Sequence, residues 1–194
     1  MYKRKIISCL LIVVLAVAAY FIVAEKNNHT VVLEANEKDG YNISYNEKAG
    51  TYSYQIYSAT GKILDEKKKL YREPYIEGID KNILHISLSA GTNVRQEWFV
   101  NRKTEEKSEI FENVCAIQGD IIAFMELDKE SEFYLVIRAI FDENKLYLEV
   151  KRNFAPLAIA DLIIENAEFT EESSLKITYL KGEDEVSTTE IITW

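Results

Sequence analysis

Acidic residues are the side chains of this sequence that come nearest to a chemical site. Four carboxylates alternate along the run Glu126-Leu127-Asp128-Lys129-Glu130-Ser131-Glu132, a spacing that directs them to one side of an extended chain. Oxygen ligands suit Ca²⁺, but the run lacks the glycine and the amide side chains of a dedicated calcium loop. Because it lies between two apolar runs, we interpret it as a solvated hairpin turn and predict no metal site.

Histidine and cysteine give no support for zinc binding or nucleophilic catalysis. His29 and His85 are far apart and no Cys-x-x-Cys pattern occurs, so a zinc ligand set is missing. Cys115 lies in the apolar stretch Val114-Cys115-Ala116-Ile117 without a recognisable histidine partner. We interpret Cys115 as a buried structural thiol and His85 as a hydrogen-bonded histidine near the core.

Enzymatic machinery is not recognisable in the sequence. The seven glycines are scattered singly, which excludes a phosphate-cradling loop, and Ser58-Ala59-Thr60-Gly61 has the composition of a turn rather than of a nucleophile elbow. A carboxylate pair for glycoside hydrolysis stays open as an alternative, because 32 acidic residues place some pair at a suitable separation. We predict that the protein is not an enzyme and has no catalytic residue or cofactor.

Tyrosines give the one indication of a binding surface. Seven of the twelve lie within residues 41–75, and exposed tyrosines stack on sugars or anchor protein interfaces. Tyrosine is also a good strand residue, so a structural role is the alternative. The candidate binding surface consists of Tyr52, Tyr54, Tyr57 and Tyr75, of which Tyr52 and Tyr54 are expected to share one strand face.

The elements that position these residues are predicted to be β-strands. Runs of four to eight β-branched and aromatic residues alternate with turn clusters from residue 31 to residue 194, the pattern of an all-β domain. The clearest hairpin joins residues 52–57 to residues 63–66 through Ala59-Thr60-Gly61-Lys62. Residues 121–125 and 134–141 are apolar on both strand faces, so we expect the middle sheets to be covered from both sides.

A short signature recurs along the chain. Residues 79–84, 117–122 and 159–164 share the form Ile-x-x-x-Ile-(Leu/Ile), and their starts are 38 and 42 residues apart. A fixed period near 40 residues indicates stacked or radially arranged sheets. We expect each segment to be the innermost strand of its own sheet. The aspartates within the three segments, which we interpret as turn residues rather than a ring of carboxylates, are Asp80, Asp120 and Asp161.

In repeat length and strand order the chain resembles the β-propeller class, whose blades are four-stranded antiparallel meanders packed face to face. The resemblance covers residues 31–194 and concerns periodicity and strand order only, since no Trp-Asp or Gly-His signature occurs; it therefore implies a fold and no functional residue. About four copies would form a small closed propeller or, as we expect, a partial one that is open. A β-sandwich is the alternative.

The first residues predict a membrane segment. Residues 1–5 carry three basic side chains, and residues 6–24 are uncharged; as a helix these nineteen residues reach about 28 Å, nearly the thickness of a bilayer core. The basic start predicts a cytoplasmic N-terminus, a tether over residues 25–30 and an extracytoplasmic β-repeat domain over residues 31–194. A cleaved signal peptide, which would give a secreted protein, is the alternative.

Net charge narrows the choice of partner. Residues 25–194 contain 20 basic and 32 acidic residues, a net charge of −12, so the domain repels nucleic acid. We therefore expect a single-pass, membrane-tethered interaction module of a bacterial envelope that binds a protein or a cell-wall component. The alternative function is an envelope carbohydrate-active hydrolase that uses a carboxylate pair.

Overall fold

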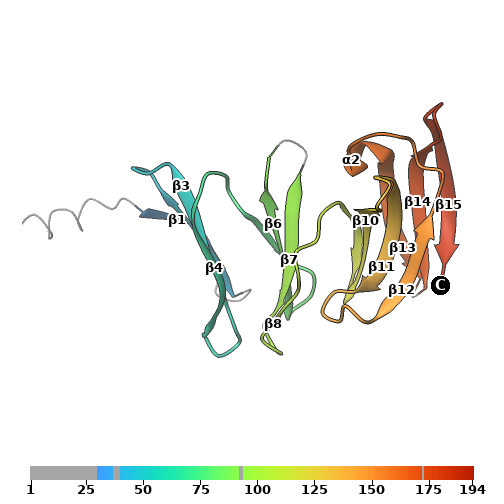
Figure 1. Ribbon diagram of the computed structural model, residues 1–194. Coiled ribbons are helices and arrows are strands. Elements are labelled where there is room, and N and C mark those ends of the chain that lie inside the picture. The colour runs from blue at the N-terminus through green and yellow to red at the C-terminus, as the bar shows by residue number, and fades with distance from the viewer. Residues whose placement is uncertain (1–29, 37–39, 92–93, 172) are drawn as a thin grey trace, which may run out of the picture.

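The computed structural model describes residues 30–36, 40–91, 94–171 and 173–194 of the 194-residue chain. Within these ranges the chain forms four separate antiparallel sheets, and each strand pairs with its neighbours in sequence. Figure 1 shows the four sheets side by side in a row, from blue near the N-terminus to red at the C-terminus. We name them sheets A to D in chain order.

The strands of each sheet follow one another without crossovers. Sheet A contains β1 (Thr30–Asn36), β2 (Tyr41–Asn46), β3 (Thr51–Tyr57) and β4 (Ile63–Leu70). Sheet B contains β5 (Tyr75–Gly78), β6 (Ile83–Ser89), β7 (Arg95–Asn101) and β8 (Glu106–Lys107). Sheet C contains β9 (Val114–Gln118), β10 (Ile121–Leu127), β11 (Phe133–Ala139) and β12 (Leu146–Lys151). Sheet D contains β13 (Ile164–Glu171), β14 (Ser174–Lys181) and β15 (Val186–Thr193), preceded by the short helix α2 (Ala160–Ile163).

Three hydrophobic clusters hold the row together, one at each joint between neighbouring sheets. The A–B cluster contains Tyr41, Ile43, Tyr54, Ile56, Ile76, Leu84, Ile86, Trp98 and Val100. The B–C cluster contains Ile83, Phe99, Phe111, Ile122, Phe124, Val136 and Ile140. The C–D cluster contains Ala123, Met125, Leu135, Ile137, Ala160, Leu175, Ile177, Tyr179 and Ile192. Each core is therefore shared by two sheets only.

Strand alternation explains how sheet C serves two clusters. On β10, Ile122 and Phe124 face sheet B, whereas Ala123 and Met125 face sheet D, because successive side chains point to opposite faces. The expectation that the middle sheets are covered from both sides is confirmed.

The outer faces of the two end sheets carry hydrogen-bonded polar side chains. On sheet A, Asn42 and Gln55 hydrogen-bond the hydroxyl of Tyr57 at 3.0 and 2.7 Å. On sheet D, Thr178 and Thr189 hydrogen-bond across two strands at 2.9 Å. End units of a stacked array need such polar faces for solubility.

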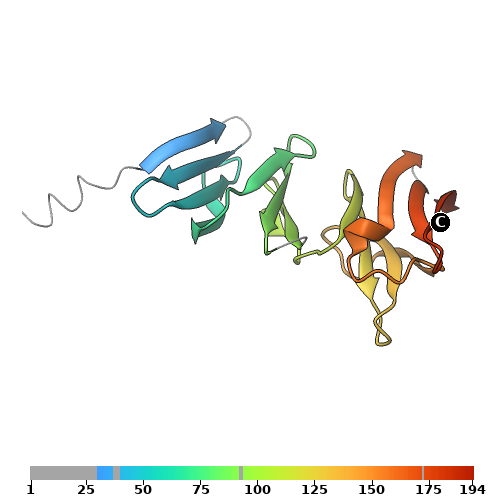
Figure 2. The same cartoon turned by 90° about the horizontal axis from the view of Figure 1, so that it is seen from above.

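The prediction of an all-β chain made of four antiparallel, blade-like sheets is confirmed. The sheets do not close on themselves, since sheets A and D lie at opposite ends of the row in both views (Figures 1 and 2). The predicted membrane segment, residues 6–24, lies outside the described residues. In the described part of the chain, no helix is long and apolar enough to span a bilayer.

The expectation that the three signature segments are equivalent inner strands is wrong. Residues 79–84 form the turn from β5 to β6 and residues 117–122 the turn from β9 to β10, whereas residues 159–164 contain α2 and the first residue of β13. Two isoleucines four residues apart fit both situations. In the first segment, Ile79 N–H donates to Ile83 C=O at 2.9 Å and closes the turn. In the third, Ile159 is the extended N-cap residue of α2 and Ile163 is the last residue of that helix.

Candidate functional site

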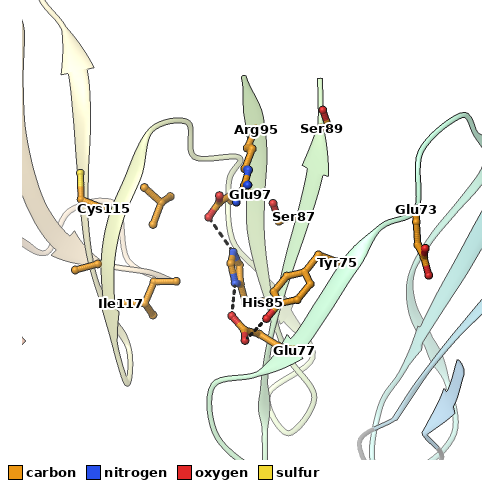
Figure 3. A pocket seen from close by; sticks show the side chains of 12 residues that line it. Glu73, Tyr75, Glu77, His85, Ser87, Ser89, Arg95, Glu97, Cys115 and Ile117 are labelled. Carbon is orange, nitrogen blue, oxygen red and sulfur yellow. Dashed lines mark hydrogen bonds and ion pairs between the residues drawn. The ribbon is translucent and has the colours of Figure 1, made fainter. Parts of the chain in front are cut away.

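A cleft of about 650 Å³ opens between sheet B and strand β9 of sheet C (Figure 3). Its sheet B side is polar and its β9 side is largely apolar. The sheet B side consists of Glu73, Tyr75, Glu77, His85, Ser87, Ser89, Arg95 and Glu97. The β9 side consists of Val114, Cys115, Ala116 and Ile117.

The cleft exists because one face of sheet B changes from apolar to polar along its length. On β6, Ile83 belongs to the B–C cluster, whereas His85 and Ser87 on the same face line the cleft. On β7 the same change runs from Phe99 to Glu97. Where the polar residues begin, sheets B and C are no longer joined by apolar packing, and the space between them opens.

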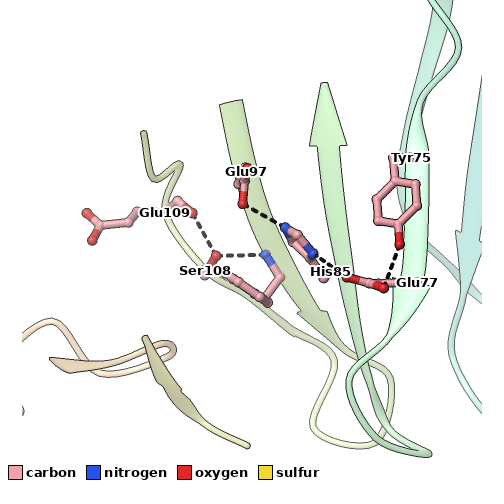
Figure 4. A network of polar contacts seen from close by, with 7 residues as sticks. Tyr75, Glu77, His85, Glu97, Ser108 and Glu109 are labelled. Carbon is pink, nitrogen blue, oxygen red and sulfur yellow. Dashed lines mark hydrogen bonds and ion pairs between the residues drawn. The ribbon is translucent and has the colours of Figure 1, made fainter. Parts of the chain in front are cut away.

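A chain of hydrogen bonds crosses the sheet B side of the cleft (Figure 4). The hydroxyl of Tyr75 donates to Glu77 Oε2 at 2.7 Å. Glu77 Oε1 lies 3.2 Å from His85 Nδ1, and Glu97 Oε2 lies 2.9 Å from His85 Nε2. The imidazole also stacks on Phe99 with a centroid separation of 5.0 Å. These hydrogen bonds lead from Tyr75, which is 57% exposed, to Glu97, which is 7% exposed.

The charges within this series of hydrogen bonds favour a protonated His85. Burial alone would lower the pKa of His85, but the hydrogen bonds and negative charges of Glu97 and Glu77 outweigh it and raise that pKa above its ordinary value. Burial would raise the pKa of Glu77, but the hydrogen bonds from Tyr75 and His85 and the imidazolium charge hold it below its ordinary value. An imidazolium bracketed by two carboxylates satisfies both of its N–H donors.

Cys115 lies on the opposite wall of the cleft (Figure 3). Its thiol donates to the carbonyl of Asn113 at 3.4 Å. Burial of the sulfur, followed by the negative charges of Asp161 and Glu97, raises the pKa of the thiol to about 12. The thiol is therefore protonated at neutral pH and is a poor nucleophile. The residue as a whole is half-buried rather than fully buried, because it borders the cleft.

The structure does not bring the four tyrosines of the predicted binding surface together. Tyr54 is fully buried in the A–B cluster, which corrects its assignment to an exposed surface. Its ring packs among apolar residues while its hydroxyl donates to Asp65 Oδ2 at 2.8 Å. Tyr52 is half-buried, Tyr57 lies on the outer face of sheet A, and Tyr75 lines the cleft.

The acidic run begins at the end of β10 and continues through the turn that leads to β11, as interpreted from the sequence. Its carboxylates at Asp128, Glu130 and Glu132 come within 4.8 Å of one another. Asp128 is engaged in that turn, since it pairs with Lys151 and accepts the backbone N–H groups of Glu130 and Glu132. The Lys151 pair and these backbone bonds lower the pKa of Asp128 to about 2.

Sequence reasoning missed Glu77, Arg95 and Glu97 as members of one site. Polar residues at every second position of an otherwise apolar strand, such as His85, Ser87 and Ser89 on β6, were the available signal.

No protein-family model matches the chain, and no curated protein matches its sequence.

Proposed function

We propose that the chain is a membrane-tethered, extracytoplasmic binding module of a bacterial envelope, and that it takes part of a protein or of a cell-wall component into the cleft between sheets B and C. The cleft carries this proposal because it combines buried, fixed charges with an apolar wall, which is the composition of ligand sites. The tether is supported by the uncharged run of residues 6–24.

The polar side chains on the sheet B side of the cleft are held in place before any ligand binds. Glu97 and His85 hold each other by the 2.9 Å bond, and Glu77 is fixed by Tyr75 and His85. Binding therefore requires little ordering of these side chains, and preorganisation of this kind raises affinity.

Charge indicates what the cleft accepts. Its lining carries the carboxylates of Glu73, Glu77 and Glu97 against the positive charges of Arg95 and protonated His85, so one negative charge is in excess. We infer that the bound group is cationic, such as a lysine or arginine side chain, with apolar neighbours that pack on β9. Such binding weakens as the salt concentration rises.

The alternative function, a hydrolase with a carboxylate pair, is less well supported by the same residues. Glu77 and Glu97 flank one another in the cleft, but His85 lies between them and bonds to both. A glycosidase needs one carboxylic acid whose pKa is raised so that it can donate a proton. The pKa of Glu77 is instead lowered, and its carboxylate is already engaged by Tyr75 and His85.

The test uses the full-length chain in a mild detergent with a photo-crosslinking amino acid in place of Tyr75, at the exposed rim of the cleft. We expect one crosslinked species from an envelope extract, and we expect Glu73→Gln and Glu97→Gln to reduce it severalfold. Glu149→Gln, an exposed position on β12 outside the cleft, is the matched control. Equal crosslinking by all three variants would show that the cleft does not bind the partner.

A further inference from the structure

Sheet D differs from the other three sheets in its strand count. Sheets A, B and C each contain four strands, whereas sheet D contains three within the ranges that the structure describes, in the order β13-β14-β15. Strand β15 is therefore an edge strand at the position where the other sheets continue with a fourth strand. It lies at the far end of the row in Figure 1.

The composition of β15 does not protect this edge. Six of its eight residues are β-branched and one, Glu190, is charged, whereas the edge strand β4 of sheet A carries five charged residues among eight. Charged side chains are the usual protection of edge strands against pairing with another chain. Two apolar side chains of β15 are also well exposed, Val186 at 57% and Ile191 at 64%.

The space beside β15 borders apolar side chains of sheet C. On β12, Leu148 and Val150 are only partly buried, although their cross-strand partners on β11, Ile137 and Leu135, are fully buried in the C–D cluster. Arg152, directly after β12, donates to Glu190 of β15 at 2.8 Å, which places the end of β12 close to β15. A strand added to β15 would therefore extend sheet D toward β12 and cover part of its apolar face.

We propose that this added strand is β15 of a second copy of the chain, paired antiparallel across a two-fold axis, so that two D sheets join into one six-stranded sheet. Pairing centred on Thr189 sets Val186 opposite Ile192 of the second copy and Ile191 opposite Ser187 of the second copy. In this register each Glu190 lies opposite Thr188 of the second copy, so the two Glu190 side chains are diagonal to each other and not directly opposite. A two-fold interface must be complementary to itself in this way.

Charge and tethering act on this dimer in opposite directions. Each copy carries a net charge of −12 over residues 25–194, so the two copies repel each other and dimerisation strengthens as salt screens that repulsion. Anchoring of both copies in one membrane would raise their effective concentration. The dimer itself depends on neither the tether nor the cleft, and it can be tested separately from the proposed function.

The test is sedimentation of the full-length chain in a mild detergent over a range of protein and salt concentrations. We expect a monomer–dimer equilibrium that shifts toward dimer at higher salt. Thr189→Lys, which sets two lysines opposite each other, should weaken dimerisation by about tenfold or more. Ala59→Lys adds the same charge in the exposed turn between β3 and β4 and should change nothing. A chain that stays monomeric, or a dimer that Thr189→Lys leaves intact, overturns the proposal.

A crosslinking variant keeps the test decisive if the lysine variant fails to fold. Directly opposite residues of an antiparallel pair have Cα atoms about 4.5–5.5 Å apart, within the range that a disulfide bridges. In a Cys9→Ser background, Thr189→Cys should give a disulfide-linked dimer under mild oxidation, whereas Ala59→Cys should not. Equal crosslinking of the two variants, or none in either, contradicts pairing through β15.

Discussion

Replacement of Asp65 by asparagine should weaken the joint between sheets A and B more than any exposed charge change would. The carboxylate of Asp65, on β4, accepts hydrogen bonds from Tyr54 Oη at 2.8 Å, Trp98 Nε1 at 2.9 Å and Lys107 Nζ at 2.8 Å. Its side chain is 9% exposed. Burial would raise the pKa of Asp65, but these three hydrogen bonds and the charge of Lys107 hold it below its ordinary value.

The size of the effect follows from the donors that lose their acceptor. Tyr54 and Trp98 are fully buried, and an unsatisfied buried donor costs about 1–3 kcal/mol. Lys107 can turn to water because its side chain is 41% exposed. Asparagine retains one acceptor oxygen but presents an amide N–H₂ to the remaining donors. We therefore expect Asp65→Asn to lower the free energy of unfolding by about 3 kcal/mol.

Urea denaturation followed by the fluorescence of Trp98 measures this loss. A Trp194→Phe background leaves Trp98 as the only tryptophan, and a loss of about 3 kcal/mol shifts the midpoint by about 1.5 M for a slope near 2 kcal/mol/M. Glu66→Gln, at the exposed neighbouring position, is the control and should shift the midpoint little. Equal shifts for both variants would refute the assigned role of Asp65.

Acid titration provides an independent check. Because the folded-state pKa of Asp65 lies below its unfolded value of about 3.9, its contribution is fully present above that value and is lost as the pH falls through the folded-state pKa. The difference between wild type and Asp65→Asn should shrink below about pH 4. A difference that does not shrink as the pH falls toward 2 would contradict ionisation of Asp65 as the cause.

Three further predictions test the remaining contacts. The pKa of His85 is raised in the folded chain. Its stabilising contribution is therefore fully present below about pH 6.5 and is lost as the pH rises through the folded-state value. His85→Gln should lower the urea midpoint of unfolding more at pH 6 than at pH 9. Gly40→Ala should cost about 2 kcal/mol, because Gly40 has a φ of +77° and a Cβ there would lie 2.1 Å from the Arg102 guanidinium; an Arg102→Ala background should reduce that cost. In a Cys9→Ser background, the Cys115 thiol, with its pKa of about 12, should react with iodoacetamide at pH 7.5 many times more slowly in the native chain than in urea, and equal rates would contradict its burial.

Strand identity could be predicted from sequence because it depends on local patterns. The hairpin between β3 and β4 was legible from the turn Ala59-Thr60-Gly61-Lys62. The double-sided burial of residues 121–125 was legible as a run that is apolar on both faces. Each of these features is decided within a few residues of the chain.

The positions of side chains between sheets could not be predicted in the same way. Tyr54 and Tyr57 belong to the same strand and are of one residue type, yet Tyr54 is buried against Trp98 and Tyr57 lies on the outer face of sheet A. What separates them is whether a neighbouring sheet covers that face, and residues more than 40 positions away decide this. The cleft was missed for the same reason, since Glu77, His85 and Glu97 meet only once β5, β6 and β7 pair.

Because the core is divided into three separate clusters, the row of sheets can bend at the joints between neighbouring sheets. Each joint depends only on the two sheets beside it, so one joint can loosen while the others stay closed. The joint between sheets B and C is held by apolar packing along only part of its length and opens into the cleft along the rest, which makes it the natural hinge. A ligand in the cleft would contact both sheets at that hinge and would fix the angle between the two halves of the molecule.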